Sequence, residues 1–255
     1  MHPAWHILEQ KEESAVVGDS DFQPDASIIG IIGGMGPMAT IELFRQIVLI
    51  TPASIDQQHL HLLIDNNPRI PDRTAAILGT GPDPLPALLS SGLRLERAGA
   101  SLLIMPCNTA HYWLEPLQEG LHTPVLSMVE ATAKRVHRAL PTARAIGLLA
   151  TRGTVLAGIY QRALAEFEID LVLPDERSQE IVSEVIYAVK AGKQESDGRT
   201  ELVADELISQ GADGVILGCT ELSVLSHQIR GVDLFDPLRI LAGDVVRAVS
   251  GWTDS

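Results

Sequence analysis

The chain contains the stretch GASLLIMPCNT at Gly99–Thr109 and a related stretch, GADGVILGCTE, at Gly211–Glu221. In each, a short apolar run typical of a buried parallel strand leads to a cysteine that lies eight residues after the opening glycine. A similar pair precedes them, because IGIIGGMG at Ile29–Gly36 resembles IGLLATRG at Ile146–Gly153. Both halves of the chain therefore share a pattern that ends in a cysteine.

The order of these matches indicates an internal duplication. A third match supports it, since PDR at 71–73 is echoed by PDER at 174–177. From the glycine that opens the pattern to the cysteine is 77 residues in the first half and 72 in the second. We therefore predict two similar α/β lobes, each with a cysteine at the carboxyl end of a parallel strand.

The rest of the chain alternates between apolar runs and segments of helical period. Strands are expected at 27–32, 59–64, 101–105, 145–149, 170–173 and 214–217, and helices at 38–50, 84–98, 129–139, 154–167, 179–190 and 200–210. This alternation predicts an α/β fold with two pseudo-symmetric lobes, each a mostly parallel sheet covered by helices. The first lobe is expected to comprise 27–126 plus 234–255 and the second 127–233, with the active site in the cleft between them.

Composition limits the classes of protein to consider. The 255 residues are 45% hydrophobic and 20% charged, which is typical of a globular protein. The formal net charge of −14 argues against binding to nucleic acid, whose phosphates attract basic surfaces. Residues 1–26 hold six acidic side chains and one basic side chain, so we expect them to form a flexible acidic tail.

The same features predict where the protein works. The N-terminus lacks the basic start and apolar run of a signal peptide, and no charge-free apolar stretch of about 20 residues occurs, so we expect no membrane span. Cys107 and Cys219 are the only cysteines, which argues against a disulfide framework and indicates a reducing compartment. A cytoplasmic location is the expectation.

Both cysteines occupy the place where α/β sheets bind ligands, outside the carboxyl ends of the strands. A helix that begins there adds N–H donors and a positive dipole, which suits an anion and lowers the pKa of a thiol. A single buried cysteine is more often a small apolar core residue. Here the only two cysteines occupy the same repeat position, which favours a functional pair that faces one cleft.

Metal-binding, redox and nucleotide-binding functions have little support in the sequence. A zinc site needs about four ligands, and the eight histidines show no ligand spacing, so we expect no metal. The chain has no C-x-x-C redox motif. The glycine-rich stretch Gly30–Pro37 matches neither the dinucleotide pattern nor a P-loop, so its glycines are expected to let the backbone approach a small ligand. Met35 in this stretch is a candidate pocket residue, with a core role as the alternative.

Two thiols that face each other suit a symmetric proton exchange. One thiolate removes a proton from one face of a carbon, the other thiol returns a proton to the opposite face, and the stereocentre inverts. The α-proton of an amino acid is far less acidic than a thiol. The site must therefore stabilise a developing carbanion with hydrogen-bond donors and positive charge.

Four motifs follow one another along the chain: GGMGPMAT at Gly33–Thr40, NPRIPDRT at Asn67–Thr74, PCNTAH at Pro106–His111 and LGCTEL at Leu217–Leu222. Together they resemble the motifs of the cofactor-independent aspartate/glutamate racemases, from about residue 27 to the C-terminus. The chain is similar to the aspartate racemase branch. The glutamate racemase branch opens instead with an Asp-Ser-Gly motif and has a His after its second Cys-Thr, where this chain has Glu221.

This resemblance implies an isomerase that interconverts L- and D-aspartate, with glutamate as the alternative, without pyridoxal phosphate or another cofactor. It also implies a homodimer. The one other partner that it implies is the substrate, a small dicarboxylic amino acid. The implied catalytic residues are Cys107 and Cys219, assisted by the carboxylates of Asp72 and Glu221. The implied substrate-binding residues are Arg73, Asn108, Thr109, Thr151, Lys190 and Thr220.

Arg73 and Lys190 would supply the positive charge that a dicarboxylate needs, and a guanidinium can bind a carboxylate in two places. Without such a role, Asp72 and Arg73 would form a surface ion pair and Lys190 would be a solvated helix residue close to Lys193. For Glu221 the alternative is a carboxylate that the dipole of a helix N-terminus favours.

Three other functions stay open. A relative with the same fold could use the thiols differently, as a hydantoin racemase, a maleate isomerase or an arylmalonate decarboxylase. A catalytically silent binding or regulatory protein could keep the scaffold, although both thiols and both carboxylates are present. Two thiols across a narrow cleft could also act as a redox switch if their Cα atoms lie within about 7 Å.

Overall fold

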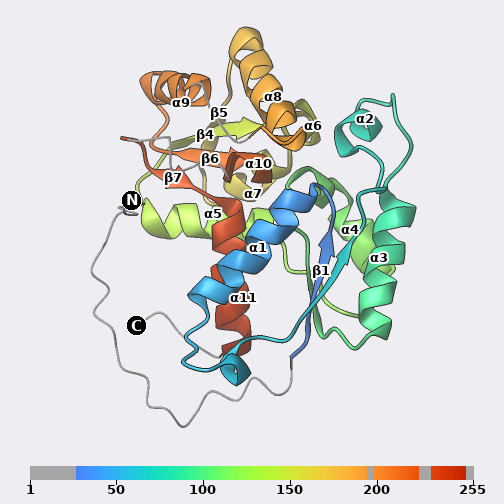
Figure 1. Cartoon of the computed structure of the whole chain (residues 1–255). Coiled ribbons are helices and arrows are strands. Elements are labelled where there is room, and N and C mark those ends of the chain that lie inside the picture. Colours follow the sequence, from blue (N-terminus) through green and yellow to red (C-terminus); the bar gives the residue numbers. More distant parts are fainter. Residues whose placement is uncertain (1–26, 194–197, 224–230, 251–255) are drawn as a thin grey trace.

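The computed structural model describes residues 27–193, 198–223 and 231–250. The predicted acidic tail at 1–26 lies outside the described residues. In the part that is described, the strands form two parallel sheets, with the orders β2-β1-β3 and β5-β4-β6-β7. Helices cover both sheets, which confirms the predicted α/β class with two lobes (Figure 1).

The first sheet is built around β1 (Ile29–Gly33), whose five residues are all buried. This strand pairs in parallel with β2 (Leu62–Asn66) on one side and with β3 (Leu102–Ile104) on the other. A strand buried on both faces is a continuous apolar run, which is why IGIIG forms the centre of the sheet. Side chains of β1 enter two core clusters, one with α1 (Pro37–Ile50) and one with α3 (Leu85–Arg97).

The second sheet repeats this order. At its centre β4 (Ala145–Ala150) pairs in parallel with β5 (Asp170–Val172) and with β6 (Val215–Gly218). A fourth, short strand, β7 (Leu234–Phe235), extends the sheet beyond β6. The remaining described elements are η1 (Asp56–Gln58), α2 (Arg73–Ile77), η2 (Thr109–Trp113), α4 (Leu114–Glu119), α5 (Met128–Ala139), α6 (Arg152–Ala157), α7 (Ile159–Ala165), α8 (Glu176–Lys190), α9 (Arg199–Ser209), α10 (Thr220–Ser223) and α11 (Pro237–Ser250).

The glycine that opens each half has the same packing role. A Cβ atom on Gly30 would lie 3.1 Å from the Cβ of Leu95 in α3. A Cβ atom on Gly147 would lie 3.1 Å from the Cβ of Leu207 in α9. In both halves a glycine in the central strand therefore lets the corresponding helix pack closely on the sheet, as expected for a duplicated unit.

The third sequence match has a structural counterpart as well. Asp72 caps α2 by accepting a 2.8 Å hydrogen bond from the backbone N–H of Ala75. Asp175 caps α8 in the same way, with a 2.8 Å bond from the backbone N–H of Ser178. Each aspartate satisfies a donor that the first turn of a helix leaves free, and each helix follows the second strand of its half.

The last helix returns the chain to the first sheet. Several side chains of α11, including Leu238, Leu241 and Val245, share a core cluster with β1 and α1. In Figure 1, α11 runs beside α1. Residues 234 and 235, which the sequence assigned to the first lobe, form β7 and pair with β6 because they continue the parallel ladder of the second sheet. The return therefore starts after them.

Three predicted elements differ clearly from the structure. The helix expected at 179–190 is α8, which begins three residues earlier because Asp175 caps it. The helix expected at 154–167 is two helices, α6 and α7, because Gly158 adopts a left-handed conformation with φ of 62° and interrupts the helix. The strand expected at 59–64 is β2, which begins at Leu62 and continues to Asn66, where it stays in register with β1.

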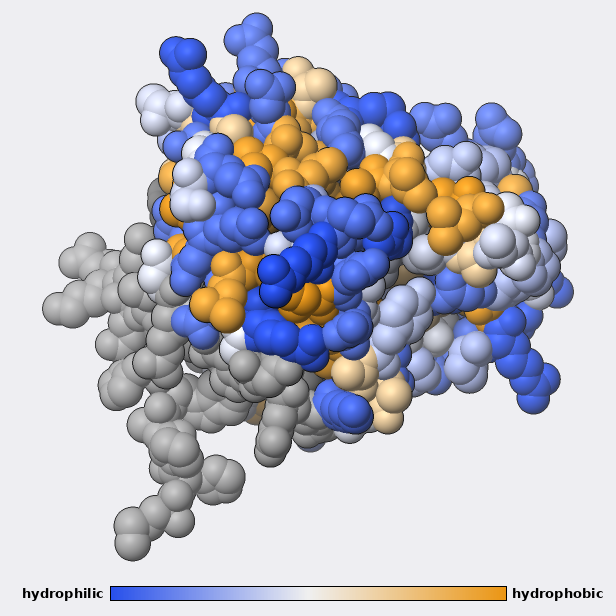
Figure 2. All heavy atoms as spheres, turned by 90° about the horizontal axis from the view of Figure 1, so that it is seen from above, coloured by the Kyte–Doolittle hydropathy of each residue, from blue (hydrophilic) through white to orange (hydrophobic). Residues whose placement is uncertain are grey.

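The outer face of the second lobe is mixed in character. Figure 2 shows this end from above, with hydrophobic side chains in a broken band among hydrophilic ones. Exposed leucines on α6 and α9, Leu156 and Leu202, belong to this end of the molecule. None of the described helices is long and apolar enough to cross a membrane.

Candidate active site

The two cysteines follow the carboxyl ends of β3 and β6 and open into one pocket. Both thiols are free, and the two residues are 5% and 6% exposed. The hydroxyl group of Thr220 donates a 3.3 Å hydrogen bond to the carbonyl oxygen of Pro106. Because these residues are the immediate neighbours of Cys219 and Cys107, the two cysteine-bearing loops contact each other directly.

The pocket encloses about 260 Å³ of space between protein atoms, part of it open to solvent. It is lined by Met35, Asp72, Arg73, Thr74, Cys107, Asn108, Thr109, Lys190, Cys219, Thr220 and Glu221. Ten of these eleven residues are those that the sequence predicts, and Thr74 is the addition. The remaining predicted residue, Thr151, lies behind the lining, 3.1 Å from Thr109 between hydroxyl oxygens. The fold thus gathers the predicted set, while the role of each residue stays a prediction.

Cys219 has a carboxylate partner. Its thiol donates a 2.9 Å hydrogen bond to Oε2 of Glu221, two residues later in α10. Burial of the thiol and the negative charge of Glu221 raise the pKa of Cys219 well above its ordinary value, and the opposing charge of Lys190 does not cancel this effect. The thiol of Cys219 is therefore protonated at neutral pH and holds a proton that it can donate.

The loop that carries Cys107 is held by a buried histidine. Nδ1 of His111 lies 2.9 Å from the carbonyl oxygen of Cys107, and the backbone N–H of Met128 donates a 3.0 Å bond to Nε2. Since Nε2 accepts a hydrogen bond, Nδ1 carries the ring hydrogen and donates to the carbonyl oxygen of Cys107. Burial lowers the pKa of His111 to about 4, so the ring is neutral near pH 7 and links the Cys107 loop to the start of α5.

Two cations face the pocket. The side chain of Arg73 is largely buried, and its Nη1 donates hydrogen bonds to the carbonyl oxygens of Ile70 and Pro71, while its Nε has no partner among the described residues. A buried guanidinium donor without an acceptor is costly, so an anionic ligand would satisfy it.

Lys190 supplies the second positive charge. Burial of its ammonium group lowers the pKa, but attraction to the ionised forms of Cys219, Glu221 and Cys107 outweighs this effect and the repulsion by Arg73, so the pKa of Lys190 is raised. The ammonium is therefore charged, and it also lies 5.3 Å from the ring centre of Tyr187.

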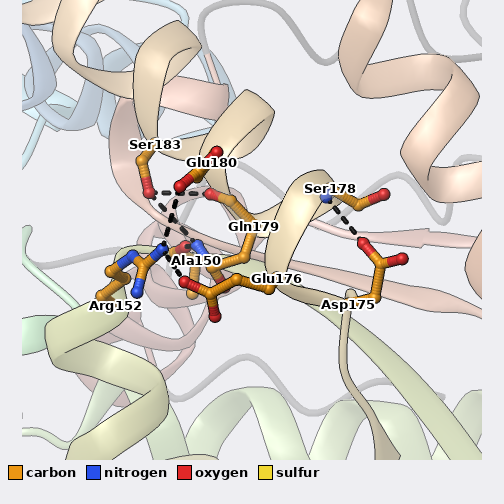
Figure 3. A network of polar contacts seen from close by, with 8 residues as sticks. All are labelled: Ala150, Arg152, Asp175, Glu176, Ser178, Gln179, Glu180 and Ser183. Atoms are coloured by element: carbon orange, nitrogen blue, oxygen red, sulfur yellow. Dashed lines mark hydrogen bonds and ion pairs between the residues drawn. The ribbon is translucent and has the colours of Figure 1, made fainter.

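A polar network positions the helix that carries Lys190. At its first turns, Arg152 forms ion pairs with Glu176 and Glu180, and Nε2 of Gln179 donates a 3.0 Å hydrogen bond to the carbonyl oxygen of Ala150 (Figure 3). Ala150 is the last residue of β4. The start of α8 is thereby fixed to the carboxyl end of the central strand, which sets the direction in which its last residue reaches the pocket.

Behind the pocket, three hydroxyl groups form a buried triangle across the two lobes. Thr109 of the first lobe lies 3.1 Å from Thr151 and 2.8 Å from Thr154 of the second lobe, and these two are 3.0 Å apart. Thr151 also caps α6 through the backbone N–H of Thr154. The triangle connects the residue two positions after Cys107 to the second sheet.

The glycine-rich loop after β1 fits tightly against the end of β2. Gly34 has φ of 97°, and a Cβ atom there would lie 2.3 to 2.6 Å from backbone atoms of Asn67. A Cβ on Gly36 would lie 3.1 Å from Oε1 of Glu221. These glycines therefore let the loop approach the site, and the loop places the buried side chain of Met35 in the pocket wall.

The helix α2 closes one side of the pocket against the second lobe. A Cβ atom on Gly153 in α6 would lie 2.7 Å from Oγ1 and 2.8 Å from Cα of Thr74. This close approach brings Asp72, Arg73 and Thr74 over the site. The side chain of Asp72 accepts a hydrogen bond from its own helix rather than from a thiol, so its assistance in catalysis stays a prediction.

Four residues close to the site are not among those that the sequence predicts. Thr74 and Thr154 reach it through the contact between α2 and α6. Tyr160 reaches it from α7, where its hydroxyl group donates to Oδ1 of Asn108. His111 stands within a recognised motif, but nothing in that motif shows its contacts. A signal existed for Thr154, because Thr151-x-x-Thr154 has the spacing of a helix cap and its third residue.

This arrangement can bind a small anion and exchange protons with it. Two thiols, two cations and several hydroxyl and amide donors surround one pocket of small volume. Such a site can hold carboxylates and stabilise negative charge that develops on a neighbouring carbon.

Comparison with known proteins agrees with this chemistry. The family model for Asp/Glu/hydantoin racemases matches residues 32–245. The broad specificity amino-acid racemase RacX of Bacillus subtilis is 30% identical over 228 residues, which cover 86% of this chain and 96% of RacX. The structure of Picrophilus torridus aspartate racemase is 31% identical with a TM-score of 0.74, covering 88% of this chain and 94% of that one. An aspartate racemase homologue from Pyrococcus horikoshii is 25% identical with a TM-score of 0.70, covering 88% and 99%.

These matches confirm the resemblance that the four motifs carry. The family model spans both cysteines and extends from the end of β1 into α11. The similar structures cover nearly the whole described chain. The chain therefore belongs to the Asp/Glu/hydantoin racemase family and is an isomerase of that family.

Proposed function

We propose that this protein is a cofactor-independent amino-acid racemase that interconverts L- and D-aspartate through the thiols of Cys107 and Cys219. The observation that carries the proposal is that both thiols open into one pocket together with two cations, Arg73 and Lys190. A pair of thiols supports proton transfer at two faces of a carbon. A pair of cations supports a substrate with two carboxylates.

The reaction needs two proton transfers. The thiolate of one cysteine takes the proton from Cα, so that the Cα–H bond breaks, an S–H bond forms and the electron pair stays on Cα, delocalised into the α-carboxylate. The thiol of the other cysteine gives its proton to the opposite face, so that its S–H bond breaks and a new Cα–H bond forms. The protonated thiol of Cys219, held by Glu221, is suited to the second step for the enantiomer whose Cα–H faces Cys107.

Stabilisation of the carbanion falls to the donors around the pocket. The hydroxyl groups of Thr109 and Thr220 supply uncharged donors, and Arg73 and Lys190 supply positive charge. Donors that are fixed before the reaction stabilise developing charge without reorganisation. Because thiols are far more acidic than the α-proton, most of the lowering of the barrier must come from this set.

The experiment follows deuterium into the product. Purified, reduced protein is incubated with L-aspartate in D2O without added cofactor, and initial product is analysed by proton NMR and chiral chromatography. Transfer between two different thiols predicts D-aspartate that carries deuterium at Cα, while recovered L-aspartate keeps its proton. Deuterium that enters L-aspartate at the same rate as it enters D-aspartate would contradict the two-thiol route.

Two variants provide the matched control. Cys107→Ala and Cys219→Ala each leave one thiol, so each is expected to lose racemisation by several orders of magnitude while it keeps the circular dichroism spectrum of the parent. If the parent is folded with free thiols and neither aspartate nor glutamate exchanges, the dicarboxylate assignment is wrong, and hydantoins and maleate are the next substrates to test.

A broad-specificity racemase is the second candidate, because RacX is 30% identical over most of both chains. Arg73 and Lys190 are expected to repel cationic side chains and to favour acidic ones. Comparing kcat/KM for aspartate, glutamate, alanine and lysine separates the two. Aspartate should exceed glutamate by about 10- to 200-fold, the usual value of one methylene group in a fitted pocket.

We also propose that the protein is a homodimer. Helix α1 exposes Met38, Ile41 and Phe44 at three-residue spacing, an apolar surface of the kind that subunit interfaces bury. Light scattering coupled to size-exclusion chromatography should give a mass near 55 kDa, about twice that of one chain of 27.5 kDa. A parent protein that elutes as a monomer of about 27.5 kDa would contradict the homodimer. A dimer whose mass Ile41→Lys leaves unchanged would contradict the role of this surface.

A further inference from the structure

Tyr160 is a completely buried side chain that the proposed reaction does not use. It lies on α7 of the second lobe, and its hydroxyl group donates a hydrogen bond to Oδ1 of Asn108, the residue after Cys107 in the first lobe. Burial strongly raises the pKa of Tyr160, so the phenol is protonated at neutral pH and can act as a donor.

Asn108 is 2% exposed and lines the pocket. A side-chain amide has one acceptor end and one donor end. Its acceptor end is occupied by Tyr160, and its donor atom Nδ2 is buried without a partner among the described residues. Buried donors are rarely left unpaired, so this N–H group is available to a ligand oxygen.

We propose that Tyr160 is a positioning residue that holds the amide of Asn108 with its N–H group directed at a carboxylate of the substrate. The inference rests on the proposed function and adds a residue to it. Without the phenol hydroxyl, the amide can rotate by half a turn and present its oxygen to the carboxylate, which repels it. Since the link joins α7 to the Cys107 loop, it also requires the two lobes to be docked.

The first experiment compares Tyr160→Phe with Tyr112→Phe, a matched control because Tyr112 is exposed and does not line the pocket. Tyr160→Phe should raise KM for both enantiomers of aspartate about tenfold and change kcat less than about threefold, because a hydrogen bond to a carboxylate is made before and during the reaction. Tyr112→Phe should change neither. An unchanged KM in Tyr160→Phe overturns the inference.

A double-mutant cycle with Asn108→Ala tests whether Tyr160 acts through Asn108. If it does, Tyr160→Phe should change KM less than about twofold once the amide is gone. An equal effect with and without Asn108 would give Tyr160 a purely structural role and overturn the inference.

A second variant keeps the test valid if Tyr160→Phe does not fold. Asn108→Asp retains an acceptor for Tyr160 and replaces the N–H group by a carboxylate oxygen. KM for aspartate should rise more than tenfold. An unchanged or lower KM would mean that the amide oxygen faces the ammonium group of the substrate, which is the opposite orientation.

Binding of succinate, a dicarboxylate that cannot racemise, separates this inference from the proposed function. Its Kd, measured by calorimetry, should rise about tenfold in Tyr160→Phe and not in Tyr112→Phe. Succinate binding that shows this pattern in a protein without racemase activity contradicts only the proposed reaction. Racemisation with an unchanged succinate Kd in Tyr160→Phe contradicts only the role of Tyr160. A protein that neither racemises aspartate nor binds succinate overturns both.

Discussion

His111 makes the stability of this protein depend on pH in a defined window. His111 is 6% exposed, and both ring nitrogens form hydrogen bonds with backbone groups. Nδ1 donates to the carbonyl oxygen of Cys107, and Nε2 accepts from the N–H of Met128. Protonation would place a hydrogen on Nε2 against the N–H of Met128 and would charge a buried ring. The folded protein therefore resists protonation of this residue, whereas the unfolded chain does not.

The size of the effect follows from the two pKa values. Burial lowers the pKa of His111 from 6.5 to about 4 in the folded state. One pKa unit is worth about 1.4 kcal/mol, so protonation of the ring costs the folded state roughly 3 kcal/mol relative to the unfolded chain. Because the pKa is lowered on folding, this penalty is absent well above pH 6.5 and grows as the pH falls towards 4.

The assay is urea unfolding of the parent and of His111→Asn at pH 7.5, 6.5, 5.5 and 4.5. Asparagine can still donate to the Cys107 carbonyl but cannot titrate, so the carboxylates and the other histidines cancel when the two proteins are compared. The parent should lose roughly 2 to 3 kcal/mol more than the variant between pH 7.5 and 4.5. Parallel stability curves for the two proteins would refute this account of His111.

Three further outcomes are expected. Glu221→Gln, made in Cys107→Ser protein, should lower the pKa of Cys219 by removing a negative charge. Iodoacetamide should then alkylate the Cys219 thiol faster at pH 7, and an unchanged rate would argue against coupling between Cys219 and Glu221. Lys190→Met should slow the same alkylation, because the ammonium lowers the pKa of that thiol. Gly34→Ala should lower the free energy of unfolding in urea by about 3 kcal/mol or more, since its Cβ would overlap the Asn67 backbone. The control Gly79→Ala, also at positive φ but with open space around it, should lower it by about 1 kcal/mol.

Most of the fold could be predicted because the chain repeats itself. Each central strand is a continuous apolar run, and each cysteine follows the third strand of its half, so the periodicity fixes both sheets and the ends at which the thiols lie. The break at Gly158 could not be predicted, because a glycine within a helical pattern is equally compatible with an unbroken helix. The helix at Pro237–Ser250 is not among the predicted elements, although its apolar residues at 238, 241, 242, 245 and 246 follow a helical period.

The site residues also fall into those that the sequence can predict and those that it cannot. Residues in local motifs, such as Cys107, Arg73 and Glu221, can be found because their neighbours in the sequence are also distinctive. Thr74 and Tyr160 reach the pocket through contacts between helices of different lobes, and no local pattern encodes how two lobes dock. Asp72 shows a different limit, because one carboxylate can both cap a helix and face a pocket, and the sequence does not separate these roles.

The two thiols stand in unequal surroundings, although the lobes that carry them are duplicates. The thiol of Cys219 donates a hydrogen bond to Glu221, while the loop of Cys107 is held through its carbonyl group by the neutral ring of His111. For enantiomers of one amino acid, equal free energies in water make the equilibrium constant one, so the Haldane relation requires the same kcat/KM in both directions. In the proposed two-thiol mechanism, any inequality between the thiols must then appear in kcat and in KM by the same factor, and the enantiomer with the lower KM is also the one that turns over more slowly.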